Sequence, residues 1–235
     1  MYSIVPLAGP DLWDEQTGFR PLTLFEGKPL IQTVLNSRPW INSHELLPQN
    51  LIFVLREVPQ LADLIQFLAD TFKGCRWIVL STLTQGALLS ALAGVSLIEK
   101  WESPLVIDLA DILYESDLSI EQCLHLDRRI EGVLPYFESQ NPAYSYLAMD
   151  EQGWVSQTRE KKVISHYASA GTYIFRSSHE YVKATEFALK NPEISTYKGS
   201  FFICPCYNGL SYIKPYPVTL RASMSLEFKT HKGFL

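Results

Sequence analysis

Two basic residues near the N-terminus have a setting that suits phosphate binding. The apolar run 4-IVPL-7 enters a small-residue turn, 8-AG-9, and after a polar loop the chain reaches Arg20 and Lys28, each directly before a proline. A glycine lets the backbone approach a ligand closely, and a guanidinium can hold a phosphate through two hydrogen bonds. The pattern predicts a loop that closes over the phosphates of a nucleotide.

A second candidate is the close cysteine pair in 201-FFICPCY-207. If this apolar run is a strand, its period of two places the sulfurs of Cys204 and Cys206 on one face, as a pair of metal ligands would need. No second pair and no nearby histidine completes a metal set. We therefore expect buried or half-buried free thiols in a reducing compartment.

Composition and charge exclude several classes of protein. The 235 residues are 47% hydrophobic and 19% charged without a low-complexity run, as in an ordinary globular protein. The formal net charge of −5, with no block of lysine or arginine, does not predict binding to nucleic acid or to an anionic membrane. The N-terminus lacks the features of a signal peptide, and the apolar stretch 86–98 is too short to cross a bilayer, so we expect a cytoplasmic protein without membrane insertion.

The elements that must position the phosphate loop alternate between strands and helices. Apolar runs predict strands at 2–7, 51–55, 76–81 and 104–109, and helical spacing predicts helices near 28–37, 59–73 and 85–101. Continuous apolar strands between helices are typical of a parallel, doubly wound α/β sheet. Such sheets bind ligands beyond the carboxyl ends of their strands, so the loops after Leu7, Ser81 and Leu109 are the places to expect a site.

The second half of the chain has a different pattern. Sheet segments are predicted at 132–139, 144–150, 153–160 and 170–175, with a hairpin turn at 150–153, then a helix that contains Tyr181 and Phe187, the run 200–207 and a segment at 216–222. No linker separates the halves, so we expect one domain over 1–235. The apolar segment 224–235 predicts either a contact in a homo-oligomer or an intramolecular strand or tail.

Four segments, in order along the chain, match the motifs of one known family. They are 4-IVPLAG-9 with 19-FRPLTLFEGKPLI-31, then 105-LVIDLADIL-113, then 141-NPAYSYLAMDEQGWVSQTREKKVISHYASAGTYIF-175, and finally 201-FFICPCYNGL-210. The chain resembles the sugar-1-phosphate nucleotidyltransferases, in particular the short capsule-biosynthesis type. The third segment is the most specific of the four.

The resemblance implies a fold and a reaction. The fold is a single-domain Rossmannoid, GT-A-like α/β structure with a mostly parallel mixed sheet flanked by helices, a smaller antiparallel acceptor-side sheet, a nucleotide-binding half at 1–130 and a sugar half at 131–235. The reaction transfers a nucleotidyl group from a nucleoside triphosphate to a sugar-1-phosphate and releases pyrophosphate, with Mg²⁺ as cofactor, in the biosynthesis of surface polysaccharide.

The resemblance also assigns residues on the nucleotide side. It implies nucleotide binding by Leu7, Ala8, Gly9, Arg20, Thr84, Gln85 and Gly86, metal binding by Asp111 with Asp108 assisting, and catalytic roles for Arg20, Asp111 and Lys161. Each has a plainer alternative. The aspartates are suited to capping a turn, Arg20 to a solvated loop, and Thr84 to the N-cap of the following helix.

On the acceptor side, the resemblance implies sugar-phosphate binding by Glu160, Lys161, Gly171 and Asn208. The lysine would meet the phosphate and the carboxylate a sugar hydroxyl. The alternative for 159-REKK-162 is an exposed charged turn.

The first loop departs from the family pattern. Members carry A-G-x-G-x-R after the first strand, whereas this chain has 8-AGPDLWDEQTG-18, which keeps Gly9 alone and places Asp11, Asp14 and Glu15 where phosphates should arrive. Three hypotheses follow: an active nucleotidyltransferase, a non-catalytic homologue that binds nucleotide or sugar phosphate, and a GT-A-type glycosyltransferase that uses 108-DLAD-111 as a metal motif.

Overall fold

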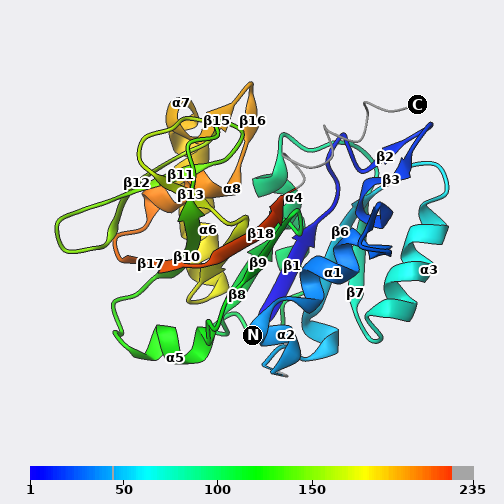
Figure 1. The fold of residues 1–235 in the computed structure, drawn as a ribbon, viewed down its shortest axis with the longest axis horizontal. Coiled ribbons are helices and arrows are strands. Elements are labelled where there is room, and N and C mark those ends of the chain that lie inside the picture. The colour runs from blue at the N-terminus through cyan, green and yellow to red at the C-terminus, as the bar shows by residue number, and fades with distance from the viewer. Residues whose placement is uncertain (44, 224–235) are drawn as a thin grey trace.

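A ten-stranded sheet forms the centre of the computed structural model, which describes residues 1–43 and 45–223 (Figure 1). The path across the sheet is β12 (Val155–Arg159), β11 (Tyr146–Met149), β13 (Tyr167–Ser169), β10 (Gly132–Glu138), β14 (Thr172–Phe175), β8 (Leu105–Asp108), β1 (Tyr2–Pro6), β6 (Leu51–Arg56) and β7 (Arg76–Leu80). Off this path, β17 (Ile213–Pro217) pairs with β10. The expected α/β fold is confirmed.

The parallel part of the sheet contains a topological switch point. β1 pairs in parallel with β6 on one side and with β8 on the other, and β7 continues outward from β6. The chain thus leaves β1 in one direction and later returns to its other side at β8. Loops that follow β1 and β8 diverge there, which leaves space for a ligand at their carboxyl ends.

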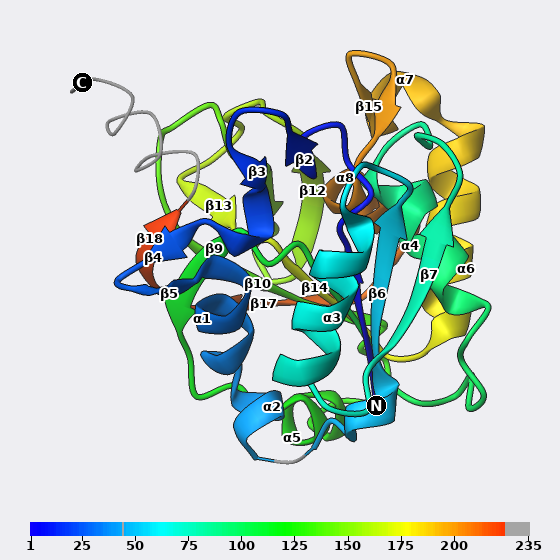
Figure 2. The same ribbon diagram turned by 90° about the vertical axis from the view of Figure 1, so that its right-hand side faces the viewer.

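Helices cover both faces of the sheet, which is why the inner strands are apolar on both sides. They are α1 (Leu30–Asn36), α2 (Pro39–Asn42), α3 (Leu61–Thr71), α4 (Ala87–Val95), α5 (Ile120–His125), α6 (Ser178–Lys190), α7 (Pro192–Ser195) and α8 (Ile203–Cys206). Figure 2 shows α1 and α3 on one side of the parallel strands and α4 and α6 on the other. The two large core clusters correspond to these two faces.

The antiparallel strands of the second half continue the same sheet. β14 pairs antiparallel with β8, and β10, β13, β11 and β12 follow. Four two-stranded antiparallel sheets complete the fold: β2 (Trp13–Asp14) with β3 (Gly18–Phe19), β4 (Leu24–Phe25) with β5 (Lys28–Pro29), β9 (Ile112–Glu115) with β18 (Thr219–Ser223), and β15 (Thr196–Tyr197) with β16 (Ser200–Phe201).

Two elements differ from the sequence expectation. The run 201–207 was predicted as a strand, but only Phe201 belongs to one, and both cysteines lie in α8. Pro205 in the same run has no N–H to donate to a sheet. The four cysteines are buried and free, as expected. The helix predicted over 85–101 ends at Val95. Ile98, beyond that end, still packs in the core, so the apolar spacing indicated burial correctly but not the end of the helix.

No helix among the described residues has the length and apolar character needed to cross a membrane. The segment 224–235, for which a contact in an oligomer or an intramolecular strand was predicted, lies outside the described residues.

Candidate functional site

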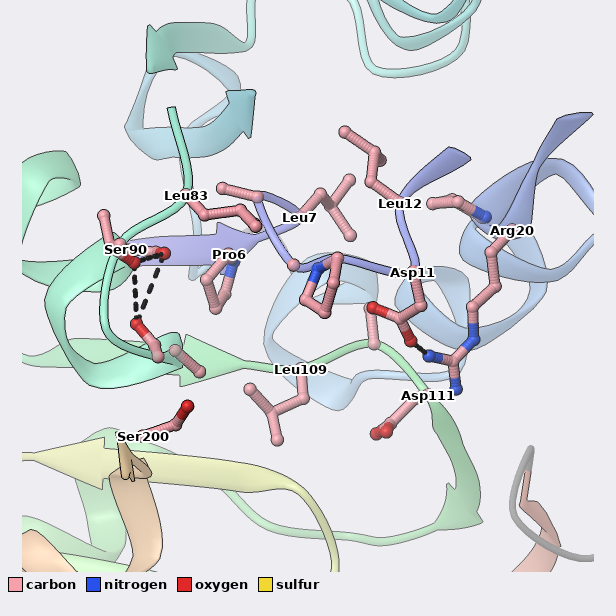
Figure 3. Close-up of a pocket in the computed structure, with 18 of the residues that line it drawn as sticks. Pro6, Leu7, Asp11, Leu12, Arg20, Leu83, Ser90, Leu109, Asp111 and Ser200 are labelled. Atoms are coloured by element: carbon pink, nitrogen blue, oxygen red, sulfur yellow. Dashed lines mark hydrogen bonds and ion pairs between the residues drawn. The ribbon is translucent and has the colours of Figure 1, made fainter. Parts of the chain in front are cut away.

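A cavity of about 300 Å³ lies at the carboxyl ends of β1 and β8, at the switch point of the sheet (Figure 3). Its walls come from five parts of the chain: residues 6–12 at the end of β1 and after it, residues 20, 21 and 30, residues between 83 and 90 at the start of α4, residues 109–111 after β8, and Ser200 with Phe202 from the second half. Loops from both halves of the chain therefore meet around one space, at the edge of the sheet where α/β proteins of this kind bind ligands.

Most of the predicted nucleotide-side residues line this cavity. They are Leu7, Ala8, Gly9, Arg20, Thr84, Gly86 and Asp111. Gln85 is not among the lining residues, and its backbone oxygen instead accepts a hydrogen bond of 2.7 Å from Phe201 N–H. The sequence placed these residues up to about a hundred positions apart, and the sheet brings them together.

Gly86 is the point where the second half of the chain closes on α4. Its φ is +115°, and a Cβ there would lie 2.2 Å from the carbonyl oxygen of Phe201, so only glycine fits. Gly86 is also the N-cap of α4, and no side chain of the residues that the structure describes caps the first amides of this helix. The Thr84 hydroxyl donates to the Gly86 carbonyl at 3.0 Å and lies 2.7 Å from the Ser90 hydroxyl, so it does not act as the predicted N-cap.

Arg20 lies at the cavity but already has an anionic partner. Its guanidinium forms an ion pair with Asp11, and Figure 3 shows the two side chains in contact at the edge of the cavity. The carboxylate of Asp11 also covers Gly9, because a Cβ built on Gly9 would lie 2.7 Å from Asp11 Oδ1. Both side chains keep contact with solvent, at 39% and 56% exposure.

Asp111 enters the same cavity with an unsatisfied oxygen. Its Oδ1 atom is buried and has no hydrogen-bond partner among the described residues. Burial raises the pKa of Asp111 above its ordinary value, Arg20 opposes the rise, and Asp108 adds to it. Gly171 lies next to Asp111: a Cβ built on it would come within 3.2 Å of Asp111 Oδ1, and its φ is +74°. A buried carboxylate oxygen without a partner is a position that a cation would stabilise.

Both solved structures that we compare have the same architecture. A nucleoside-diphosphate-sugar pyrophosphorylase from Vibrio cholerae superposes with a TM-score of 0.75 at 20% identity, covering 92% of each chain. A protein from Bacillus anthracis assigned as a glucose-1-phosphate thymidylyltransferase, with sucrose bound, superposes with a TM-score of 0.74 at 12% identity, covering 99% of this chain and 93% of that one. The chain shares their fold. No protein-family model and no curated protein matches the sequence.

Asp108 differs from Asp111 in that both of its oxygens are occupied. Arg38 Nε and Nη2 donate to Oδ2 and Oδ1 at 2.6 and 3.1 Å, Ala110 N–H donates to Oδ1 at 2.9 Å, and the Thr172 hydroxyl donates to Oδ2 at 3.2 Å. Arg38 is fully buried and stacks on the Tyr114 ring at 4.0 Å. Asp108 is thus fixed by these contacts and is not among the residues that line the cavity, although it holds the lining residue Ala110 through the Ala110 N–H.

The acceptor-side pair Glu160 and Lys161 stands next to the cavity wall. Lys161 Nζ lies 5.6 Å from the ring centroid of Phe202, which lines the cavity, and 5.1 Å from that of Tyr197. Glu160 accepts a hydrogen bond from the Ser145 hydroxyl. Burial raises the pKa of Glu160, while this hydrogen bond and Lys161 lower it and Asp111 raises it further, so the charges of the two halves act on one another.

Asn208, in contrast, is occupied by the backbone. Its Oδ1 accepts from Thr158 N–H at 2.9 Å, and its Nδ2 donates to the carbonyls of Thr158 and Pro205 at 3.1 and 2.8 Å. The amide therefore joins β12 to α8, and the structure does not bring it to the cavity.

Two arginines near the site were missed from the sequence. Arg38 carries no local signal, because its partner is 70 positions away. Arg56 ends β6 and donates to the carbonyl of Gly9 at 3.3 Å, so it supports the turn at the cavity. The sequence could have indicated Arg56, because it comes directly after the apolar run 51–55 and ligands of parallel sheets bind at the carboxyl ends of the strands.

The predicted magnesium ligands fit the ion in part. Among the described residues, no group of three or more histidine, cysteine, aspartate or glutamate side chains is arranged to hold a metal. Mg²⁺ nevertheless binds proteins through one or two carboxylates together with substrate phosphates, and the buried, unpartnered Oδ1 of Asp111 suits that role. Asp108 is committed to Arg38.

Proposed function

We propose that this protein is a sugar-phosphate nucleotidyltransferase that acts in the biosynthesis of surface polysaccharide. The observation that carries the proposal is the cavity at the switch point. Gly9, Arg20, Gly86 and Asp111 line it together, in a fold shared with a nucleoside-diphosphate-sugar pyrophosphorylase. The nucleoside triphosphate enters along the 1–130 half, and the sugar-1-phosphate along the 131–235 half.

The chemistry demands positioning and charge stabilisation more than a nucleophilic side chain. A phosphate oxygen of the sugar-1-phosphate attacks the α-phosphorus of the triphosphate, a new P–O bond forms, and the bond to pyrophosphate breaks, so pyrophosphate carries the electron pair away. Arg20 lines the cavity, and Lys161 Nζ lies 5.6 Å from the ring centroid of Phe202, which also lines it. Each is suited to hold one of the two anionic substrates.

Asp111 would hold Mg²⁺ in this reaction. The ion, when bound, neutralises the negative charge that the two phosphate groups bring together. A side chain at Gly171 would approach Asp111 Oδ1, so the glycine leaves that space free. Gly86 and Ala87, at the start of α4, line the same cavity, and no side chain of the described residues caps this helix.

A turnover assay tests the proposal. The protein is incubated with each of the common nucleoside triphosphates, Mg²⁺ and a panel of sugar-1-phosphates, and pyrophosphate is measured. We expect release that depends on one nucleotide, one sugar phosphate and Mg²⁺ together, and that Asp111→Ala abolishes. Absence of release from every pair would reject the transferase activity.

A second candidate, a non-catalytic homologue that binds a nucleotide or a sugar phosphate, is favoured by the Asp11–Arg20 ion pair. That contact occupies the one arginine that lines the cavity in the described chain, and Pro10 removes a backbone donor from the turn. Saturable nucleotide binding without pyrophosphate release would support this candidate. The glycosyltransferase alternative needs Asp108 as a metal ligand and loses it to Arg38.

A further inference from the structure

The turn after β1 contains a carboxylate in the place that a ligand phosphate would need. Asp11 pairs with the guanidinium of Arg20, and its Oδ1 occupies the space that a side chain on Gly9 would take. These are the two kinds of group that bind phosphate best: a glycine that allows close approach and an arginine that donates two hydrogen bonds. All three residues line the cavity.

We propose that Asp11 is a specificity-determining residue that competes with the phosphates of the ligand for Gly9 and Arg20. This inference rests on the proposed function, because it assumes that an anion enters the cavity. Arg20 can give both of its terminal nitrogens to a triphosphate only when the Asp11 carboxylate, which now holds Nη1, moves away. A ligand that reaches the cavity without using Arg20 is not opposed in this way.

The charge of the cavity has the same consequence. Its ionisable lining side chains are Asp11, Arg20 and Asp111, so two carboxylates face one guanidinium that is already paired. An incoming polyphosphate therefore meets repulsion at the mouth of the cavity, and removing one of these charges at close range matters more than removing one at a distance.

The Asp11–Arg20 pair is well placed for such exchange. Both side chains keep contact with solvent, so the pair holds little free energy and can open without disturbing the core. The segment that carries Asp11 is held at its ends instead, where Arg56 donates to the Gly9 carbonyl and Arg20 N–H donates to the Leu12 carbonyl at 3.1 Å.

The experiment compares Asp11→Asn with Glu15→Gln, a matched control. Both substitutions remove one negative charge from the same exposed loop, and in the described structure Arg20 pairs with Asp11 and not with Glu15. Binding of inorganic tripolyphosphate and of each nucleoside triphosphate, with Mg²⁺ present, is measured by isothermal titration calorimetry at low and at high salt.

We expect Asp11→Asn to tighten tripolyphosphate and nucleoside triphosphate binding about tenfold at low salt, and less at high salt, while Glu15→Gln changes the affinity less than about twofold. In an Arg20→Ala background, most of the gain from Asp11→Asn should vanish. Equal affinities of wild type and Asp11→Asn, or an equal gain from Glu15→Gln, would overturn the role of Asp11 and leave the proposed function standing. Absence of binding by wild type and by both variants would overturn the proposed function as well.

Discussion

The described part of the chain has two arginine–aspartate pairs near the switch point, and they differ in burial and in hydrogen bonding. Arg38 and Asp108 are buried, with hydrogen bonds to both carboxylate oxygens and an aromatic ring stacked on the guanidinium. Arg20 and Asp11 are partly exposed at the cavity. The first pair cannot exchange its partner for a ligand without leaving a buried charge, whereas the second can. Burial therefore distinguishes a structural pair from the pair that we propose can exchange its partner for a ligand.

The largest expected effect comes from breaking the buried pair. Arg38→Met leaves Asp108 as an uncompensated buried carboxylate, and we expect a loss of about 3–5 kcal/mol in the free energy of unfolding, measured with urea. Arg20→Met is the control, because its partly exposed pair should change that free energy by less than about 1 kcal/mol. Arg38→Met with Asp108→Asn should recover part of the loss. Equal effects at Arg38 and Arg20 would contradict the distinction between the pairs.

A third aspartate sharpens the comparison, because Asp111 is half-buried and has no arginine bound to its Oδ1. Asp111→Asn removes the charge at nearly constant volume, so we expect the free energy of unfolding to rise by about 1 kcal/mol at neutral pH. The same substitution at Asp108 should lower it, since Arg38 would lose its counterion. Urea unfolding of both variants measures whether each substitution raises or lowers the free energy of unfolding. A lower value for Asp111→Asn would be inconsistent with an uncompensated carboxylate.

A smaller effect is expected in the pH dependence. Burial raises the pKa of Asp111, so the native protein binds this proton more tightly than the unfolded chain does. The protonated Asp111 side chain therefore stabilises the native protein fully below about pH 3.9, the ordinary pKa of an aspartate. This stabilisation is lost as the pH rises through the pKa of Asp111 in the native protein. The stability of Asp111→Asn relative to wild type should therefore increase as the pH rises from about 4 and then level off. Urea titrations at successive pH values should show this slope, and a constant difference would argue against a raised pKa.

The smallest effect concerns the exposed pair itself. Asp11→Asn should change the free energy of unfolding by less than about 1 kcal/mol, because water solvates both groups when the pair opens. Thermal and urea unfolding would reveal a larger cost. Such a cost would mean that the Asp11–Arg20 contact holds the turn in place.

Much of the fold follows from the sequence, because its signals are local. The strands at β1, β6, β7 and β8 lie within one or two residues of the apolar runs that predicted them, and the mixed sheet follows from the alternation with helices. The helix α4 and the turn α8 show the limit of such signals. Apolar spacing indicates burial but not the type of element. Ile98 is buried beyond the end of α4, and Cys206 is buried in α8 and not in the strand that the sequence predicted.

The candidate site was predictable where its residues follow strands. Gly9 and Asp111 come after β1 and β8, so the parallel sheet brings them to one edge. Which partner each charged side chain takes was not predictable, because that depends on contacts between distant segments. Arg38 reaches Asp108 across 70 positions, and the side chain of Asn208 turns to the backbone of Thr158.

The most direct test is the Mg²⁺-dependent binding of nucleoside triphosphates to wild type and to Asp111→Asn, measured by isothermal titration calorimetry, with urea unfolding of both proteins as a check on folding. We expect wild type to bind at least one triphosphate, and Asp111→Asn, which should remain folded, to bind it at least about tenfold more weakly. Equal binding by the two proteins, or no binding by wild type to any nucleotide, would contradict a nucleotide site at the carboxyl ends of β1 and β8.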